Sequence, residues 1–577
     1  MMAAVEPVGS DAARDLAGRR WRILALLAIV ALAFVLRVPH AGAGFPYLHH
    51  WNEPESASTA LRMMVTGDLN PQFFNYGTLP IYLYVGVDVL NYFRLMGKPA
   101  GAESHLTSLD ELEFSVAPKE RWNVSHPSFY HWNRLVSVVF GTATVVSVYF
   151  LGAALSGPAV GLIAALWLAL APFHIVHSGR ITPDALVTFL ALNVVLFSIR
   201  FLDRERLSDL ATAFAFAGLA CATKYNTAVM MILPVALLGW SALKKPSRIN
   251  LWQGALLLAL PVLLFLTAMP YAILDLPGFL RGAGLEVRHY RVDGHGPLTS
   301  EPGWQQIKFQ AAEFWRNNGI LAIALAIGGV AANWRRSKYL WLLLAPALYF
   351  AFMIQMRPNF HRNFLVLYPF VAIWIASALV LLHRALASRA PGRWPIHRLG
   401  VALGVLVLLL PAVRSTAAAY TVGRQVETRS EAVSRLNELQ SKGFEKAVIA
   451  SELAVHPLDL ARLELPHEQM ATNRMAALMN NAPRTVFVLP EDFVYEEVFK
   501  TPGQVRLDAV LDRVRDALPA ERILERIGGE LDRSLHHTGD PPFPEPGKTH
   551  LEYYSVNPVI LLVSGGAARP QPLAPSR

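Results

Sequence analysis

Most of the chain up to residue 413 consists of apolar runs separated by short polar and often basic connections. A transmembrane helix needs about 20 predominantly apolar residues, and the first run of this kind is WRILALLAIVALAFVLRV at residues 21–38. Further runs follow at 135–155, 157–172, 185–202, 209–222, 226–243, 251–269, 318–333, 339–356, 363–383 and 399–413. The pattern predicts an α-helical polytopic membrane protein with about eleven transmembrane helices.

One further apolar segment, residues 79–97, carries Asp88 and Arg94. If it crossed the membrane, the basic clusters that follow would all lie outside, against the positive-inside rule. These clusters are 200–206, 244–248, 333–338 and 383–398. We therefore predict that residues 79–97 lie along the membrane surface as an interfacial helix. Residues 39–134 then form a large first loop, with juxtamembrane helices on the outer face.

The chain changes character after residue 413. Helical periodicity near 425–441 and 506–517 alternates with the β-rich runs KAVIA (446–450), TVFVLP (485–490) and PVILLV (558–563). This predicts a small C-terminal α/β extramembrane domain. The predicted organisation is a cytoplasmic N-terminus (1–20), a membrane module (21–413), an α/β domain on the outer face (414–566) and a disordered Pro-rich tail (567–577).

Composition supports a membrane protein and limits its partners. The 577 residues are 53% hydrophobic and only 16% charged, which excludes an ordinary soluble enzyme. The net charge of +9 comes from short clusters between apolar runs, so it reports topology and predicts no nucleic acid partner. The single cysteine, Cys221, excludes an intrachain disulfide.

The heptad HHWNEPE (49–55) directly follows the first predicted helix and crowds acids, histidines and an amide at one membrane exit. One interpretation is a capped helix start, with Asn52 as N-cap and Glu55 completing a capping box. The other is a catalytic carboxylate, because an acid near a low-dielectric surface has a raised proton affinity. The two interpretations are compatible.

The first loop, residues 49–84, resembles the C-type membrane glycosyltransferases that use polyprenyl-phosphate sugars. This superfamily includes the protein O-mannosyltransferases and the bacterial lipid A aminoarabinose transferase. The matching pieces are Asn52-Glu53, Gly67-Asp68, Leu79-Pro80-Ile81-Tyr82 and the stretches 134–152, 171–186 and 222–234. The resemblance covers residues 20–385.

The resemblance also implies site residues. Asn52 stands where the family usually has its catalytic Asp, and an amide cannot take a proton from a hydroxyl. Glu53 is therefore the predicted general base, with Asn52, His50 and Glu55 in support. Asp184 falls in the stretch that resembles the family's second acidic site and is the second predicted catalytic acid, although its position also suits a helix N-cap.

A lipid phosphate leaving group needs cations to stabilise its developing charge. Arg134 and Lys224, with Tyr225 beside Lys224, are predicted to bind this donor phosphate. An alternative for Arg134 is a cation that extends to the lipid headgroups at the membrane interface. Arg362 is interpreted as a contact to lipid headgroups. Residues 286–296 are interpreted as a substrate-shaping loop. With only one phosphate on the donor, no metal or other cofactor is predicted to be required.

The function implied is an enzyme: a glycosyltransferase that moves a sugar from a polyprenyl-phosphate donor to a lipid, glycan or protein hydroxyl, with inversion. The predicted location is the bacterial cytoplasmic (inner) membrane, in contact with membrane lipids, with the active site and C-terminal domain on the periplasmic side. Three alternatives remain. The first is a catalytically impaired protein that binds or assembles lipid-linked sugars, which would explain Asn52 in place of the usual acid. The second is a polysaccharide polymerase or ligase of similar size that uses a lipid diphosphate donor. A transporter is disfavoured because the polar residues gather at one face and no repeat is visible.

Overall fold

The protein is described from a computed structural model of the 577-residue chain. The structure describes residues 9–47, 50, 52–99, 105–114, 124–245, 249–295, 299–389, 413, 427–453, 455–471, 474–475, 478–479, 481–490, 522–527 and 560–565.

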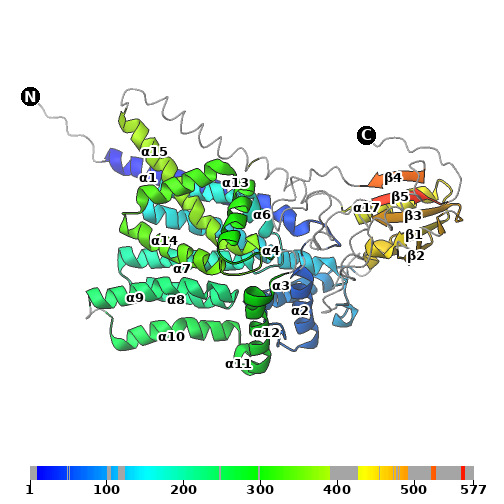
Figure 1. Ribbon diagram of the computed structural model, residues 1–577, viewed down its shortest axis with the longest axis horizontal. Coiled ribbons are helices and arrows are strands. Elements are labelled where there is room, and N and C mark those ends of the chain that lie inside the picture. Colours follow the sequence, from blue (N-terminus) through cyan, green and yellow to red (C-terminus); the bar gives the residue numbers. More distant parts are fainter. Residues whose placement is uncertain are drawn as a thin grey trace, which may run out of the picture.

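A bundle of apolar helices forms the larger part of the molecule (Figure 1). Seven of them are long and apolar enough to cross a membrane, and three shorter apolar helices join them. They are α1 (Gly9–Gly42), α4 (Pro127–Ser156), α5 (Pro158–Ala169), α7 (Asp184–Arg204), α8 (Leu207–Cys221), η2 (Tyr225–Met231) with α9 (Ile232–Lys244), α10 (Leu251–Ala268), α13 (Trp304–Asn333), α14 (Ser337–Met353), and η5 (His361–Leu367) with α15 (Tyr368–Arg389). The polytopic helical fold is confirmed. The count of eleven is not, because the last predicted span, 399–413, lies outside the described residues apart from Val413.

Close helix contacts in the bundle depend on glycines. A Cβ atom on Gly152 of α4 would lie 3.0 Å from the Cα atom of Gly161 in α5. A Cβ atom on Gly329 of α13 would lie 2.0 Å from the carbonyl oxygen of Trp374 in α15. Within a membrane the hydrophobic effect does not drive helices together, so small residues that allow backbones to approach become the main source of packing energy.

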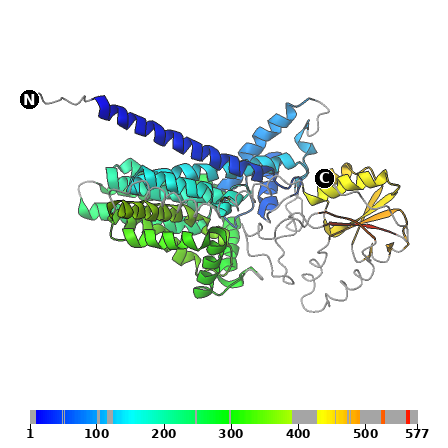
Figure 2. The same cartoon turned by 90° about the horizontal axis from the view of Figure 1, so that it is seen from above.

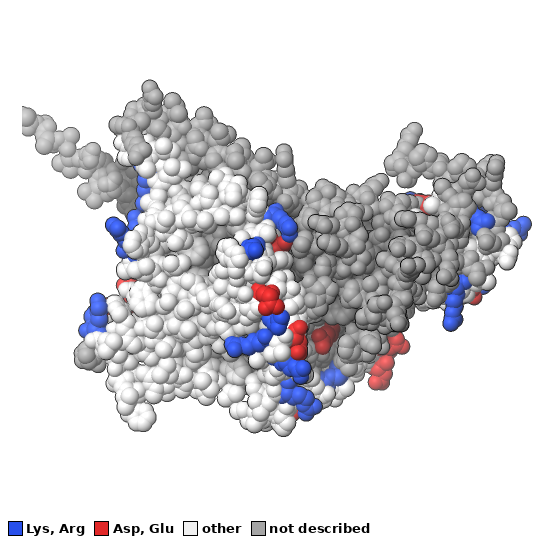
Figure 3. Space-filling model, in the orientation of Figure 1, with Lys and Arg blue, Asp and Glu red and all other residues white. Residues whose placement is uncertain are grey.

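The two ends of the bundle differ in their polar residues. At one end, Lys245 after α9 pairs with Glu205 after α7 at 2.9 Å, and Lys338 at the start of α14 pairs with Asp203. These ion pairs join three of the basic clusters that the topology argument assigns to one side. In Figure 3 the surface between the bundle ends is almost free of charged side chains, as expected for a lipid-facing band.

The other end carries the first loop and the connection after α10. Its elements are α2 (Asn52–Thr66), α3 (Leu79–Met96), η1 (Leu109–Glu111), α6 (Pro172–His177), α11 (Tyr271–Leu274), α12 (Leu276–Arg288) and the π-helical turn η3 (His289–Asp293). In Figure 1, α2 and α12 stand across the direction of α8, α9 and α10. The segment 79–97 forms α3, which is not among the seven membrane-length apolar helices. Its polar residues face α4: Asp88 is fully buried, and Asn91 donates to Ser128 at 3.0 Å.

The C-terminal sheet lies beyond this end of the bundle (Figures 1 and 2). Its strands are β1 (Lys446–Ala450), β2 (His467–Met470), β3 (Thr485–Pro490), β4 (Ile523–Ile527) and β5 (Ile560–Ser564), accompanied by α17 (Thr428–Gln440), η6 (Ser451–Leu453) and α18 (Pro457–Ala461). The order is β2-β1-β3-β5-β4, with β1 parallel to both neighbours and β5 antiparallel to both of its own. The three predicted strands and the helix near 425–441 are confirmed. The predicted helix at 506–517 and the tail lie outside the described residues.

Tyr47 connects this domain to the first loop. Its hydroxyl donates to Asp459 Oδ2 at 2.8 Å and accepts the backbone N–H of His456 at 3.0 Å. The Arg429 guanidinium lies 3.6 Å from the centre of the Tyr47 ring, and Arg429 is itself held by buried Glu427. Because its hydroxyl makes hydrogen bonds while its ring contacts a cation, Tyr47 is a specific contact between the first loop and the C-terminal domain.

We expect Tyr47→Phe to weaken this docking by about 1–3 kcal/mol, because two hydrogen bonds are lost while the ring contact stays. Amide hydrogen exchange should show faster exchange in α17 and α18. Tyr92→Phe on α3 is the control, since no hydrogen bond joins its hydroxyl to a described residue. Unchanged protection in Tyr47→Phe would show that other contacts hold the domain.

The topology also makes a direct prediction. A periplasm-active reporter fused after Pro99 should be active, because α3 does not return the chain across the membrane, and one fused after Arg204 should be inactive. A reversed signal at either site would contradict the predicted orientation.

Candidate active site

Glu53 and Arg134 form a buried bidentate ion pair between α2 and α4. Arg134 Nε lies 2.8 Å from Glu53 Oε1, and Arg134 Nη2 lies 2.9 Å from Oε2. The backbone N–H of Ile181 also donates to Oε1 at 2.9 Å, and Arg134 Nη1 donates to the carbonyl of Ala43 at 2.6 Å. Both side chains are essentially inaccessible, at 0% and 2% exposure. The pair therefore ties together three segments that are distant in sequence.

This pairing fixes the charge of Glu53. Burial alone would raise the pKa of its carboxyl group, but the charge and hydrogen bonds of Arg134, the nearby His50 and the Ile181 amide outweigh it and lower the pKa to about 2. The sequence placed this acid beside the membrane and expected a raised proton affinity. The proton affinity is instead lowered, because Arg134 contacts the carboxylate directly. This partner could not be identified from the local sequence.

Asp184 and Lys224 form a second pair at the same end of the bundle. Lys224 Nζ donates to Asp184 Oδ1 at 2.7 Å and to Asn363 Oδ1 at 2.6 Å. Asp184 begins α7, and Lys224 lies in the short turn between α8 and η2. The side chain of Lys224 is 12% exposed, against 2% for Arg134. Lys224 is therefore the more accessible of the two predicted phosphate ligands.

His50 and Arg362 join the heptad to the stretch 357–363. Arg362 Nη1 lies 3.1 Å from His50 Nε2, and its guanidinium covers the ring of Phe360 at 4.3 Å. The backbone N–H of Asn52 lies 3.2 Å from His50 Nδ1. Together with the two ion pairs, this contact brings residues from the stretches 49–55, 174–185, 223–226 and 357–363 to one place.

The remaining predicted residues line the same region. Asn52 and Glu55 are half-buried at the start of α2, and burial raises the pKa of Glu55. Tyr225 donates its hydroxyl to the carbonyl oxygens of Phe74 and Tyr76 at 3.0 and 3.2 Å, so it braces the first loop. The catalytic and binding roles assigned to all these residues stay predictions. Among the described residues, no group of three His, Cys, Asp or Glu side chains could hold a metal ion.

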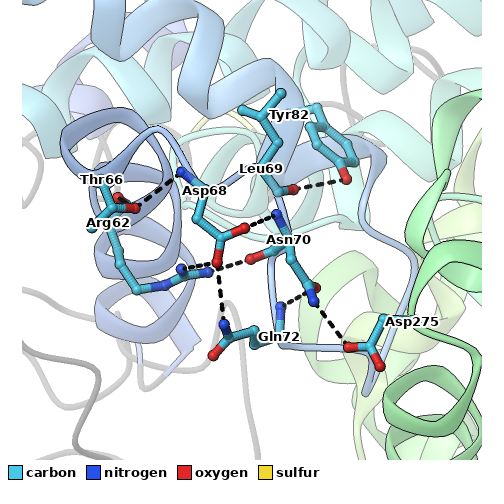
Figure 4. Close-up of polar contacts among 8 residues, drawn as sticks. All are labelled: Arg62, Thr66, Asp68, Leu69, Asn70, Gln72, Tyr82 and Asp275. Carbon is cyan, nitrogen blue, oxygen red and sulfur yellow. Dashed lines mark hydrogen bonds and ion pairs between the residues drawn. The ribbon is translucent and has the colours of Figure 1, made fainter.

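A polar turn after α2 connects the first loop to α12 (Figure 4). Asp68 accepts the backbone N–H of Asn70 at 2.9 Å and the Gln72 amide at 3.3 Å, and Arg62 donates to the Asn70 carbonyl at 2.5 Å. The Asn70 side chain then donates to Asp275 Oδ2 at 2.9 Å. Asp275 caps α12 by accepting the Gly278 N–H at 3.1 Å. The turn that contains Gly67 and Asp68 thus holds the start of α12 against the first loop.

Sequence analysis missed the contribution of α12. Residues 286–288 complete this helix and 289–293 form η3, so most of the predicted loop is helical. The Phe279 ring meets those of Phe74 and Tyr225 at 6.0 and 6.1 Å, and a Cβ atom on Gly282 would lie 2.8 Å from Phe74 Cβ. Glu286 is one turn further along this face. The helical spacing of these residues was the signal that could have identified it.

The environment of Glu286 differs from that of Glu53. Burial raises the pKa of its carboxyl group, Lys224, Arg362 and His295 lower it, and Glu55 raises it, with a net increase to about 7. A carboxylate with such a pKa exchanges its proton near neutral pH.

Known proteins provide an independent comparison. Residues 132–267 match the family model described as dolichyl-phosphate-mannose-protein mannosyltransferase. The resemblance to the protein O-mannosyltransferases among the C-type membrane glycosyltransferases is thus confirmed over these residues. The matched part includes Arg134, Asp184 and Lys224 but neither the heptad nor α12. No curated protein matches the sequence.

Several solved structures are similar at low identity. ArnT from Cupriavidus metallidurans, bound to undecaprenyl phosphate, is 15% identical with a TM-score of 0.49, covering 83% of this chain and 95% of that one. AglB from Archaeoglobus fulgidus, in complex with an inhibitory peptide and a dolichol-phosphate, is 12% identical with a TM-score of 0.47, covering 75% and 62%. The S. cerevisiae Pmt1-Pmt2 complex, bound to the sugar donor, is 17% identical with a TM-score of 0.33, covering 44% and 34%. The chain spans about 62% of the length of the archaeal protein.

We expect Glu53→Gln to lower the free energy of unfolding by about 3–5 kcal/mol, because it leaves the Arg134 charge buried without a partner. The midpoint of thermal unfolding in detergent should fall, and adding Arg134→Met should recover part of the loss. The control is Glu205→Gln, which breaks an exposed pair worth about 0–1 kcal/mol. Unchanged stability together with a turnover loss of about 10²–10⁴-fold would favour the base role predicted from sequence.

Proposed function

We propose that the protein is a glycosyltransferase that moves a sugar from a polyprenyl-phosphate donor to a hydroxyl acceptor on the outer face of a bacterial cytoplasmic membrane. The observation that carries the proposal is the convergence of Asp184, Lys224, Arg362 and the heptad at one end of an apolar helix bundle. A lipid-linked donor can present its phosphate at such an end while its chain stays in the membrane. The family match over residues 132–267 supports the same reaction class.

Lys224 and Arg362 are the proposed ligands of the donor phosphate. Both lie at the starts of 3-10 segments that lead into bundle helices, and Asn363, next to Arg362, accepts from Lys224 at 2.6 Å. Cations held in this way stabilise the charge that develops on the leaving phosphate. Arg134 was also expected to bind this phosphate, but its guanidinium is buried and engaged by Glu53 and Ala43. Its position supports a structural role.

The proposed chemistry is a single displacement with inversion at the anomeric carbon. The acceptor is a hydroxyl of a lipid, a glycan or a protein, and its activation requires a base near neutral pH. Glu53 and Asp184 are each paired with a cation, which weakens both as bases. Asp184 would instead orient Lys224. Because the leaving group has one phosphate and the chain supplies cations, the proposal includes no metal ion.

A second candidate function is binding or assembly of lipid-linked sugars without turnover. Asn52, in place of the acid usual in the resembling family, favours it. Donor binding by a wild-type protein that transfers no sugar to any acceptor would support this candidate over the enzyme.

The donor-phosphate assignment is tested by two substitutions that break the same ion pair. Lys224→Met should weaken binding of a polyprenyl-phosphate sugar by about 1.5–3 kcal/mol, the range for hydrogen bonds to charged groups. Asp184→Asn should preserve or tighten binding, because the cation remains and its competing carboxylate is gone. The measurement is binding of radiolabelled polyprenyl-phosphate sugars to purified protein, followed by transfer to a panel of acceptors. Equal losses in the two variants would show that the pair is only structural.

A further inference from the structure

Glu286 lies on the helix face that contacts the first loop on one side and Asn363, beside the proposed phosphate ligand Arg362, on the other. Gly282, one turn before it, packs against Phe74. Tyr290, one turn after it, accepts the Asn363 side-chain N–H at 3.0 Å on its hydroxyl. Residues spaced by four along a helix lie on one face. The side chain between these two contacts is therefore directed at the same face as Asn363 and Lys224.

Charged and titratable groups from the surrounding elements interact with this carboxylate. Glu55 from α2, Lys224 before η2, His295 after η3 and Arg362 from η5 act on the pKa of Glu286. The Glu286 charge in turn raises the pKa of Tyr76 in the first loop, Tyr225 in η2 and Tyr290 in η3. The cations Lys224 and Arg362 are the proposed phosphate ligands.

Glu286 is also chemically available. Its side chain is half-buried, and no hydrogen bond or ion pair joins its carboxylate to a described residue. Glu53 and Asp184, in contrast, are each held by a cation within 3 Å. A carboxylate that no cation contacts directly keeps more of its proton affinity, so it can accept a proton from a substrate.

We propose, on the basis of the proposed glycosyl transfer, that Glu286 is the general base that takes the proton from the acceptor hydroxyl. As the acceptor O–H bond breaks, its proton passes to a Glu286 carboxylate oxygen, and the acceptor oxygen forms a bond to the anomeric carbon. The bond from that carbon to the phosphate oxygen breaks, and its electron pair leaves on the polyprenyl phosphate, next to Lys224 and Arg362. Glu286 then releases the proton to water.

Glu55 is the nearest competitor for this role. It is also half-buried, and no hydrogen bond or ion pair joins it to a described residue. However, Glu286 lies one turn before Tyr290, whose hydroxyl accepts from Asn363 next to Arg362. The charges of Lys224 and Arg362 also lower the pKa of its carboxyl group. Glu55 serves to raise the proton affinity of Glu286 through like charge.

The test compares Glu286→Gln, Glu55→Gln and the control Glu205→Gln in sugar transfer from the donor that the wild type uses. Glu205 is an exposed glutamate at the opposite end of the bundle, where it pairs with Lys245. In the wild type, kcat/KM should rise with pH through an acidic limb near pH 7, because the base must be deprotonated. Glu286→Gln should lower kcat by about 10²–10⁴-fold and abolish the limb. Glu286→Asp should keep the limb at a reduced rate.

Glu55→Gln should move the limb to lower pH, because it removes a negative neighbour, and Glu205→Gln should match the wild type. Binding of unsubstituted polyprenyl phosphate by Glu286→Gln, equal to or tighter than wild type, should show that the site is intact. If Glu286→Gln misfolds, the position of the acidic limb in the kcat/KM profiles of Glu55→Gln and Glu286→Asp tests the assignment instead. A wild-type rate and limb in Glu286→Gln, or an unmoved limb in Glu55→Gln, would overturn the assignment while the proposed function stands. If the wild type transfers no sugar from any donor, both are overturned.

Discussion

A buried ion pair determines how the first loop meets the membrane bundle. Removing two charges from water costs several kcal/mol each, and this cost is offset only when the geometry is good and the remaining lone pairs are satisfied. The pair of Glu53 and Arg134 meets both conditions through its bidentate contact and the Ile181 amide. Because the carboxylate cannot move without leaving a charge unpaired, α2 has one position relative to α4. The rest of the heptad follows from that position.

The site is built outward from this pair in a series of contacts. The end of α2 leads into the turn of Asp68, which orders Asn70, and Asn70 reaches Asp275 at the start of α12. Tyr225 holds the returning part of the same loop, and Phe279 packs against that tyrosine. α12 is therefore fixed at its start by hydrogen bonds and along its length by aromatic contacts. The position of Glu286 depends on a pair of residues that it does not touch.

Much of the fold could be predicted from sequence because hydrophobic patterns are local. The apolar runs and the strands at 446–450 and 485–490 rest on composition over short windows. The assignment of 79–97 to an interfacial helix rests on the sides to which the later basic clusters are assigned. What could not be predicted was which charge pairs with which. Glu53 and Arg134 are 81 residues apart, and no periodicity links an acid in one loop to a cation in the next helix.

The carboxylates at this end of the bundle show why that missing information matters for chemistry. Glu53, Glu55, Asp184 and Glu286 are buried or half-buried, so desolvation pushes the pKa of each upward. Whether the pKa of a given carboxyl group ends above or below its ordinary value depends on the charged groups around it. The pKa of Glu53 falls to about 2 because Arg134 contacts it directly, whereas that of Glu286 rises to about 7 because its cations act from further away and Glu55 opposes them. Glu53 and Glu286 are thus the same residue type at the same end of the bundle, and their pKa values move in opposite directions. The direct ion pair of Glu53 holds the site together, and the proposed base role falls to a glutamate that no cation contacts directly.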